Sequence, residues 1–245
     1  FISGGLGGIG FETAMEMTRC AKNVSLILIG RSKLPEKSEW DSILQNKPES
    51  ETAEKIERIS TLKNNTKNVE YYAIDISDAD ALKSVIQSAA EKYGKINGVV
   101  HAAGVSGSIT FDRLNEEYIT KMLIPKVVGT YVLDHATRDQ DLDFFLMFSS
   151  ISTIFSSADL LGYISGNMYL DSYSDYRKKA CGSKSITVNW ATWSEIGMAV
   201  KSNFTIDTLF QTIKTRDAIN ALFDVLSNGS GSTVVARLNL KDKIS

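Results

Sequence analysis

Apolar runs alternate along the chain with segments whose apolar residues recur every three to four positions. The runs predict seven strands, at 1–3, 24–29, 69–74, 96–101, 144–148, 185–190 and 233–236. The periodic segments predict helices directly after the first strand and at 78–93, 115–135, 163–179 and 217–226. Strands that alternate with helices in this way predict an α/β fold: one doubly wound, parallel, seven-stranded Rossmann sheet that forms a single domain, 1–245.

The stretch 33–67 departs from this alternation. It holds 14 charged residues among 35, and two prolines interrupt it. We interpret it as a mobile, polar surface insertion that ends in a short helix bearing Ile56, Ile59 and Leu62.

The charge balance argues against several classes of protein. Lys plus Arg is 27 and Asp plus Glu is 29, which gives a net charge of −2, so we expect no nucleic-acid partner. No apolar stretch approaches the roughly 20 residues of a membrane helix, so we expect no membrane partner. Cys20 and Cys181 have no metal-ligand spacing, which predicts a reducing, cytoplasmic location. With only two histidines, neither a metal site nor a Ser-His-Asp hydrolase is expected.

The chain starts inside its first predicted strand. A domain would not begin there, so the sequence has the character of an excerpt from a longer polypeptide. No signal peptide is expected, because the apolar start runs directly into a glycine loop.

That loop has the Gly-x-Gly-x-x-Gly spacing of dinucleotide-binding sites, and it follows a strand and opens a helix, as the motif requires. Glycine permits the turn and the close approach to a pyrophosphate, which the N–H groups of the helix terminus then bind. The predicted cofactor-binding residues here are Gly4, Gly5, Leu6, Gly7, Gly8, Ile9 and Gly10.

Arg31 and Ser32 follow the second strand, where an NAD site would carry a carboxylate. A guanidinium and a hydroxyl suit a 2′-phosphate, which predicts NADPH as the cofactor. Asp75, with Ile76 beside it, ends the third strand and can accept a hydrogen bond from adenine. Asp75 could equally cap the next helix, although Ser77 or Asp78 would serve as well.

Four residues compose a reductase site that needs neither metal nor histidine. Tyr163 and Asn167 share one helical face, Ser150 follows the fifth strand, and Lys126 lies in the helix after the fourth strand. A ketone needs a proton as it accepts hydride, a nearby ammonium would lower the pKa of the phenol, and the serine can hold the carbonyl oxygen. Each residue alone could be a surface side chain or a helix cap, whereas the four together fit one template.

These motifs resemble the short-chain dehydrogenase/reductase family, and more closely the ketoreductase domains of modular polyketide synthases, over almost the whole chain. The resemblance includes His101, Ala102, Ala103 and Gly104, which match a variant of the family's Asn-Ala-Ala-Gly motif and are predicted to lie at the cofactor. Ordinary family members carry Lys four residues after the Tyr and Asn in the preceding helix. Here Asn167 and Lys126 are exchanged, as in the ketoreductases of polyketide and fatty acid synthases.

The resemblance implies the catalytic half of a ketoreductase that reduces a 3-oxoacyl thioester to a 3-hydroxyacyl thioester with NADPH. It implies an acyl carrier protein with a phosphopantetheine-tethered substrate as a partner, together with neighbouring synthase domains. An upstream structural subdomain and a substrate lid at 197–215 are also implied. Two alternatives are a fatty-acid-type 3-oxoacyl reductase and a non-reducing dinucleotide-fold domain that serves as a scaffold.

Overall fold

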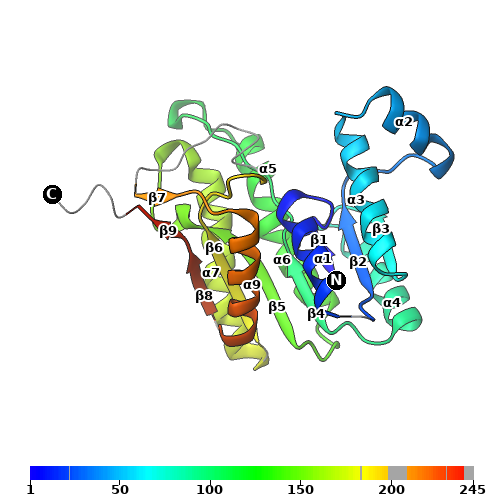
Figure 1. Cartoon of the computed structure of the whole chain (residues 1–245). Coiled ribbons are helices and arrows are strands. Elements are labelled where there is room, and N and C mark those ends of the chain that lie inside the picture. The colour runs from blue at the N-terminus through cyan, green and yellow to red at the C-terminus, as the bar shows by residue number, and fades with distance from the viewer. Residues whose placement is uncertain (22, 183, 198–208, 230, 240–245) are drawn as a thin grey trace.

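Seven parallel strands form the centre of the structure, a computed structural model that describes the chain except residues 22, 183, 198–208, 230 and 240–245 (Figure 1). Their order across the sheet is β3-β2-β1-β4-β5-β6-β8. The strands are β1 (Ile2–Ser3), β2 (Leu26–Gly30), β3 (Val69–Ala73), β4 (Gly98–His101), β5 (Phe144–Ser150), β6 (Ser185–Trp190) and β8 (Gly231–Val235). The predicted doubly wound parallel sheet is confirmed, and its order reverses between β1 and β4, where such sheets bind ligands.

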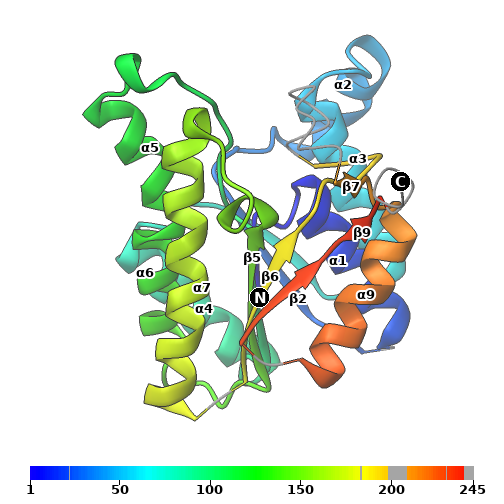
Figure 2. The same cartoon turned by 90° about the vertical axis from the view of Figure 1, so that its left-hand side faces the viewer.

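Helices cover both faces of the sheet (Figure 2). One layer comprises α1 (Gly8–Cys20), α3 (Glu51–Asn65) and α9 (Thr215–Asn228), and the other comprises α4 (Ala79–Tyr93), α6 (Val128–Ala136) and α7 (Leu161–Cys181). Each layer buries its apolar face against the sheet, so the strands are apolar on both sides and read as continuous apolar runs.

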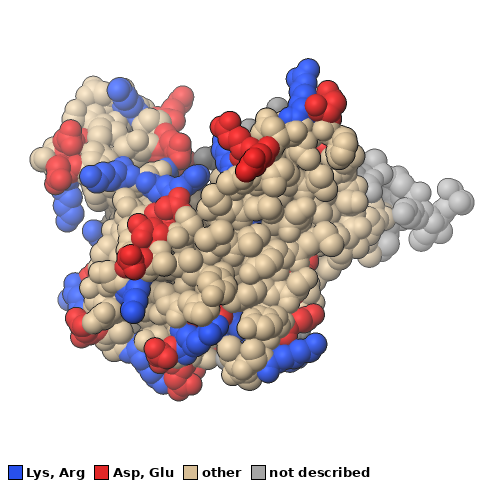
Figure 3. Space-filling view, turned by 180° about the vertical axis from the view of Figure 1, so that it is seen from behind, with Lys and Arg blue, Asp and Glu red and all other residues tan. Residues whose placement is uncertain are grey.

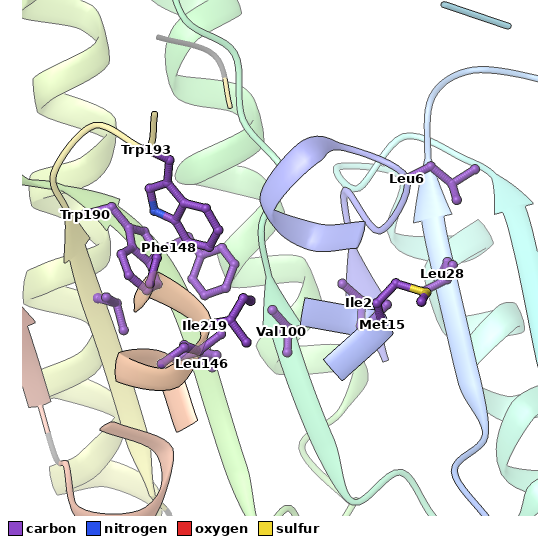
Figure 4. Close-up of a cluster of buried hydrophobic side chains, with 14 of the residues drawn as sticks. Ile2, Leu6, Met15, Leu28, Val100, Leu146, Phe148, Trp190, Trp193 and Ile219 are labelled. Carbon is purple, nitrogen blue, oxygen red and sulfur yellow. The ribbon is translucent and has the colours of Figure 1, made fainter. Parts of the chain in front are cut away.

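Figure 4 shows the core on the α1–α3–α9 side. Ile2 and Leu28 lie on neighbouring strands beneath Met15 of α1, and Leu146 of β5 lies beneath Ile219 of α9. Toward the carboxyl ends of the strands the core becomes aromatic, with Trp190 packed edge-on against Phe148 and Trp193 at centroid distances of 5.8 and 5.0 Å. This aromatic cluster forms the floor of the region where the site lies.

The segment 33–67 ends in the predicted helix, but this helix packs on one face of the sheet as a regular element of the fold rather than closing a surface insertion. Helix α3 has 15 residues, and the Ser50 hydroxyl caps it by accepting from the N–H of Ala53 at 3.1 Å. Its apolar face is fully buried, at Ala53, Ile56, Ile59 and Leu62. Within this segment, the 3₁₀ turn Lys37–Glu39 and α2 (Trp40–Asn46) contain no buried residue.

The helix predicted at 115–135 is two helices, α5 (Glu116–Lys126) and α6, which separate at Val127. Pro125 has no N–H to donate within α5. Its carbonyl is bound by the His101 ring at 3.1 Å, and the carbonyl of Lys126 accepts from the Thr130 hydroxyl. At the break in the helix, two backbone carbonyls thus have side chains as hydrogen-bond partners.

Beyond the main sheet, β7 (Phe210–Gln211) and β9 (Arg237–Leu238) pair antiparallel. The expected lid at 197–215 falls largely on 198–208, which lie outside the described residues. Figure 3 shows charges of both signs around the edge of the face formed by α4, α6 and α7, with an uncharged middle. In the part of the chain that is described, no helix is long and apolar enough to cross a membrane.

A buried ion pair joins α6 to α7. The Asp134 carboxylate accepts from Nε of Arg177 at 2.7 Å, from the hydroxyl of Tyr173 at 2.8 Å and from Arg138 at 3.0 Å. Asp134 and Arg177 are 0% and 3% exposed, and the guanidinium lies 4.3 Å from the centroid of the Phe145 ring. Because charges this deep are tolerated only when they are paired, Asp134 fixes α7 against α6.

We therefore expect Asp134→Ala to lower the free energy of unfolding by about 3 kcal/mol, because Arg177 would lose a buried carboxylate partner. Urea unfolding monitored by circular dichroism measures this change. Asp139→Ala, an exposed carboxylate in the same region, should change the free energy by less than about 0.5 kcal/mol. Similar values for the two variants would contradict a role for Asp134 in joining the helices.

Candidate active site

A cavity of about 690 Å³ opens at the carboxyl ends of the strands. The glycine loop, the ends of β2 to β6 and one face of α3 line it. The predicted site residues that line it are Gly4, Leu6, Gly7, Gly8, Ile9, Gly10, Arg31, Asp75, Ile76, Ala102, Ala103, Gly104, Lys126, Ser150 and Tyr163. Residues from seven separate segments of the sequence therefore meet in one cavity, at the point where the strand order reverses.

The glycine loop fits closely between β1 and β4. Gly4 has φ +68°, and a Cβ there would lie 2.9 Å from backbone atoms of Ala102 and Ala103. A Cβ on Gly10 would lie 2.3 Å from the carbonyl oxygen of Gly4, which brings α1 against the strand. Gly5 also has a packing role, because a Cβ there would meet Leu28 at 2.7 Å; its contact with a cofactor stays a prediction.

The loop fits a dinucleotide by its chemistry as well as its shape. Helix α1 begins after Gly7 with no side chain capping its first N–H groups, and no acidic residue lies in its first turn. These N–H groups and the positive end of the helix dipole face the cavity wall built by the loop, which suits a pyrophosphate. Such contacts can hold a dinucleotide without a covalent bond to the protein.

Arg31 lines the cavity at the end of β2, whereas Ser32 lies behind it. The Ser32 hydroxyl accepts from Nζ of Lys55 at 2.5 Å, and its carbonyl accepts from the Tyr71 hydroxyl at 2.6 Å. Ser32 is thus held in place by two neighbours.

The two readings of Asp75 can now be separated. Its carboxylate accepts from the N–H and hydroxyl of Ser77 at 2.9 and 2.6 Å, while Asp78 caps α4 by accepting from the N–H of Ala81. Asp75 is therefore not the cap of α4. It is exposed and lines the cavity.

His101 is fully buried and does not itself line the cavity, so it adjoins the predicted cofactor site from behind the cavity wall. Its Nε2 lies 3.1 Å from the carbonyl oxygen of Pro125, which can only accept, so Nε2 carries the proton and Nδ1 accepts from the Ser3 hydroxyl at 2.7 Å. Burial and nearby Lys126 lower the pKa of His101 to about 3, so the ring is neutral. His101 joins β1, β4 and α5 behind the cavity wall.

The Lys126 side chain extends to the cavity in close contact with two glycines. A Cβ on Gly104 would lie 2.8 Å from its Cε, and a Cβ on Gly166 would lie 3.2 Å from its Cβ. Its ammonium donates to the carbonyl of Phe148 at 2.6 Å. Burial lowers the pKa of Lys126 to about 8, although the Asp171 carboxylate opposes the decrease. The lysine is thus largely charged at neutral pH and fixed at the end of β5.

Tyr163 lies half-buried on the first turn of α7. Burial raises the pKa of its phenol, while hydrogen bonds from Ser150 and Asn167 partly offset the rise. Burial dominates the pKa of Tyr163, and the Lys126 ammonium is directed to the Phe148 carbonyl, so a lowering of this pKa by Lys126 stays a prediction. The phenol remains protonated at neutral pH.

Asn167 and Ser150 support the tyrosine from two elements. Asn167 is fully buried and donates to the carbonyl of Tyr163 at 2.9 Å, and its Oδ1 has no hydrogen-bond partner among the described residues. Ser150 accepts from the N–H and hydroxyl of Ser152 at 3.2 and 2.9 Å, so it caps the following 3₁₀ turn as well as contacting the phenol. The capping alternative therefore applies to Ser150, and its assignment to the site stays a prediction.

One face of α3 also lines the cavity, and sequence reasoning missed it. Its four charged residues are Glu51, Glu54, Lys55 and Arg58. Their spacing of 0, 3, 4 and 7 places them on one side of a helix, and this signal was present in the segment interpreted as an insertion. Trp190 and Trp193 line the cavity too.

The fold and the cavity are those of a short-chain dehydrogenase/reductase with a Rossmann-type sheet. The family model "KR domain" matches residues 1–195, and the chain belongs to this family.

Relatives and solved structures agree with this assignment. Polyketide synthase PksN of Bacillus subtilis is 32% identical over 244 residues, which cover 96% of this chain and 4% of the synthase. A 6-methylsalicylic acid synthase of Aspergillus terreus is 33% identical, over 83% of this chain and 11% of its own length. A ketoreductase domain from the bacillaene assembly line has a TM-score of 0.83 at 26% identity, covering 98% of this chain and 55% of that one. The chain thus spans a small part of the curated relatives it matches.

The close approach of Gly4 to Ala102 and Ala103 can be tested with two alanine variants. Gly182 has a similar φ, +64°, but a Cβ there would meet no described atom within 4 Å apart from those of its own chain neighbours. Gly182→Ala should cost about 1–2 kcal/mol of unfolding free energy from the backbone alone. Gly4→Ala should cost about 2 kcal/mol more, because the methyl group also clashes with the neighbouring backbone. Equal losses in thermal unfolding would contradict the close approach.

Proposed function

We propose that the protein is an NADPH-dependent ketoreductase that reduces a 3-oxoacyl thioester to a 3-hydroxyacyl thioester. The observation that supports this most directly is the meeting of Ser150, Tyr163 and Lys126 in the cavity that Arg31 and the glycine loop also line. When bound, NADPH supplies the hydride. The glycine loop and the first turn of α1 would hold its pyrophosphate, and Arg31 its 2′-phosphate.

Tyr163 is the proton donor in this proposal. Its raised pKa keeps the phenol protonated, and the carbonyl oxygen of the substrate takes the phenolic proton as negative charge develops on it. Ser150, which already contacts the phenol, donates a hydrogen bond to the same oxygen. The two donors together orient the carbonyl and stabilise the charge that forms.

Lys126 and Asn167 act on the tyrosine. The ammonium, fixed by the Phe148 carbonyl, stabilises the phenolate that remains after proton transfer. Asn167 donates to the Tyr163 carbonyl and so holds the first turn of α7 in place. Its Oδ1, which has no partner among the described residues, can accept a hydrogen bond inside the site.

The substrate and partners are inferred from the relatives. PksN and its homologues are polyketide synthases, so an acyl carrier protein bearing a phosphopantetheine-tethered substrate is the partner we propose, with neighbouring synthase domains beside it. The same residues would serve a fatty-acid-type 3-oxoacyl reductase. The complete set of Ser150, Tyr163 and Lys126 favours either reductase over a non-reducing scaffold.

Tyr163→Phe tests the catalytic assignment. The variant should reduce an N-acetylcysteamine 3-oxoacyl thioester about 10²–10⁴-fold more slowly than the wild type, because it removes the proton donor. Its Kd for NADPH should change little, since only one hydroxyl is lost. Oxidation of NADPH at 340 nm and fluorescence titration measure the two quantities. A variant that keeps most of its turnover would assign the acid to another group, and a wild type without turnover would refute the reductase.

The pH dependence tests Lys126. Because its pKa is about 8, the ammonium is charged below that pH and loses its proton above it, so the turnover number should fall as the pH rises through 8. The other titratable groups that face Lys126 are His101, which is neutral throughout this range, Asp171, and Tyr163, whose raised pKa lies higher. Lys126→Met should be slow at pH 7 and lack the decline near pH 8. A decline that persists in this variant would contradict the assignment.

A further inference from the structure

The N-terminal half of α3 lies beside the carboxyl end of β2, where the proposed function places the 2′-phosphate of the cofactor. Nζ of Lys55 lies 2.5 Å from the hydroxyl of Ser32 and 2.5 Å from the carboxylate of Glu51. Lys55 lines the cavity together with Arg31. The Lys55 ammonium of α3 therefore lies at Arg31 and Ser32, the two residues that predict a 2′-phosphate site.

The Lys55 side chain is already ordered before any ligand binds. It is only 16% exposed, although it bears a charge. Ser32, to which it is bound, is in turn fixed by the Tyr71 hydroxyl on the neighbouring strand. Because the ammonium, the hydroxyl and the loop are held in one arrangement, binding an anion here needs little further loss of side-chain freedom.

The second cation on this face, Arg58, is engaged elsewhere. Its guanidinium donates to the carbonyl of Leu6 at 2.7 Å, pairs with Glu54 at 2.5 Å and lies over the Phe11 ring. Arg58 thus supports the glycine loop. Lys55 has three N–H donors, of which Ser32 and Glu51 take two, and the third can bind a phosphate oxygen.

We propose that Lys55 of α3 is a specificity-determining residue, which binds the 2′-phosphate of NADPH together with Arg31, while Ser32 holds the Lys55 ammonium in place. This inference rests on the proposed function, because it assumes that the cofactor carries a 2′-phosphate. Glu51 offsets part of the Lys55 charge, so the contribution is that of one charge-assisted hydrogen bond. Discrimination between NADPH and NADH thus depends on a helix outside the strand-end motif.

The test is a pair of dissociation constants, for NADPH and for NADH, measured by fluorescence titration without substrate. Lys55→Ala should raise the Kd for NADPH about tenfold and the Kd for NADH less than about twofold, because only NADPH has the 2′-phosphate. Lys55→Arg keeps the charge and should retain most of the preference. Arg31→Ala, measured in parallel, should also weaken NADPH more than NADH.

Lys63→Ala is the matched control. Lys63 is on the same helix, eight residues further on and therefore about 12 Å along the axis, and does not line the cavity. Its loss should leave both constants within about twofold, because charges at that distance are screened. If Lys55→Ala weakens both nucleotides equally, or neither, the inference is overturned. If the wild type itself does not prefer NADPH, the proposed cofactor is wrong, and that outcome is distinct.

Discussion

The site depends on a lysine whose ammonium is almost entirely removed from water. Burying a charge is costly unless polar partners compensate, and Lys126, 5% exposed, has the Phe148 carbonyl as a bonded partner and the Asp171 carboxylate nearby. Its aliphatic stem fits only because Gly104 and Gly166 have no side chains. The turn after β4, the end of β5 and the start of α7 are thus fixed relative to one another by one side chain.

The interruption of the helix lies directly beside this lysine. Lys126 ends α5, and the carbonyl of the preceding residue, Pro125, is bound by His101 rather than by the next helical turn. Since His101 also accepts from Ser3, the position of Lys126 is linked to β1, on whose following loop the cofactor site is built. The neutral ring keeps this link unchanged across the physiological pH range. His101, which contacts neither the cavity nor solvent, therefore connects the Lys126 side of the cavity to the glycine-loop side through hydrogen bonds.

The sheet and most site residues could be predicted because they follow from patterns that local sequence carries. Apolar runs marked the strands, and the spacing of Tyr163 and Asn167 marked one helical face. The roles of Gly5 and His101 could not be derived, since both depend on what packs behind the loop: Leu28 in one case and Pro125 in the other. The cavity-lining face of α3 could not be predicted because the prolines and charges of the segment indicate a polar surface loop. The apolar spacing at Ile56 and Ile59 predicts only a short helix.

The directions in which the pKa values of Tyr163 and Lys126 are shifted bear on whether the site is suited to reduction or to oxidation. A phenol whose pKa is raised by burial is a resting acid, and a lysine whose pKa is lowered to about 8 remains largely protonated at neutral pH. An acid that holds its proton until a carbonyl oxygen begins to carry negative charge is suited to reduction. Oxidation of an alcohol would instead require the phenolate as a base, which burial disfavours. Burial at the start of α7 thus keeps the Tyr163 phenol in the protonated form that the proposed proton donation requires.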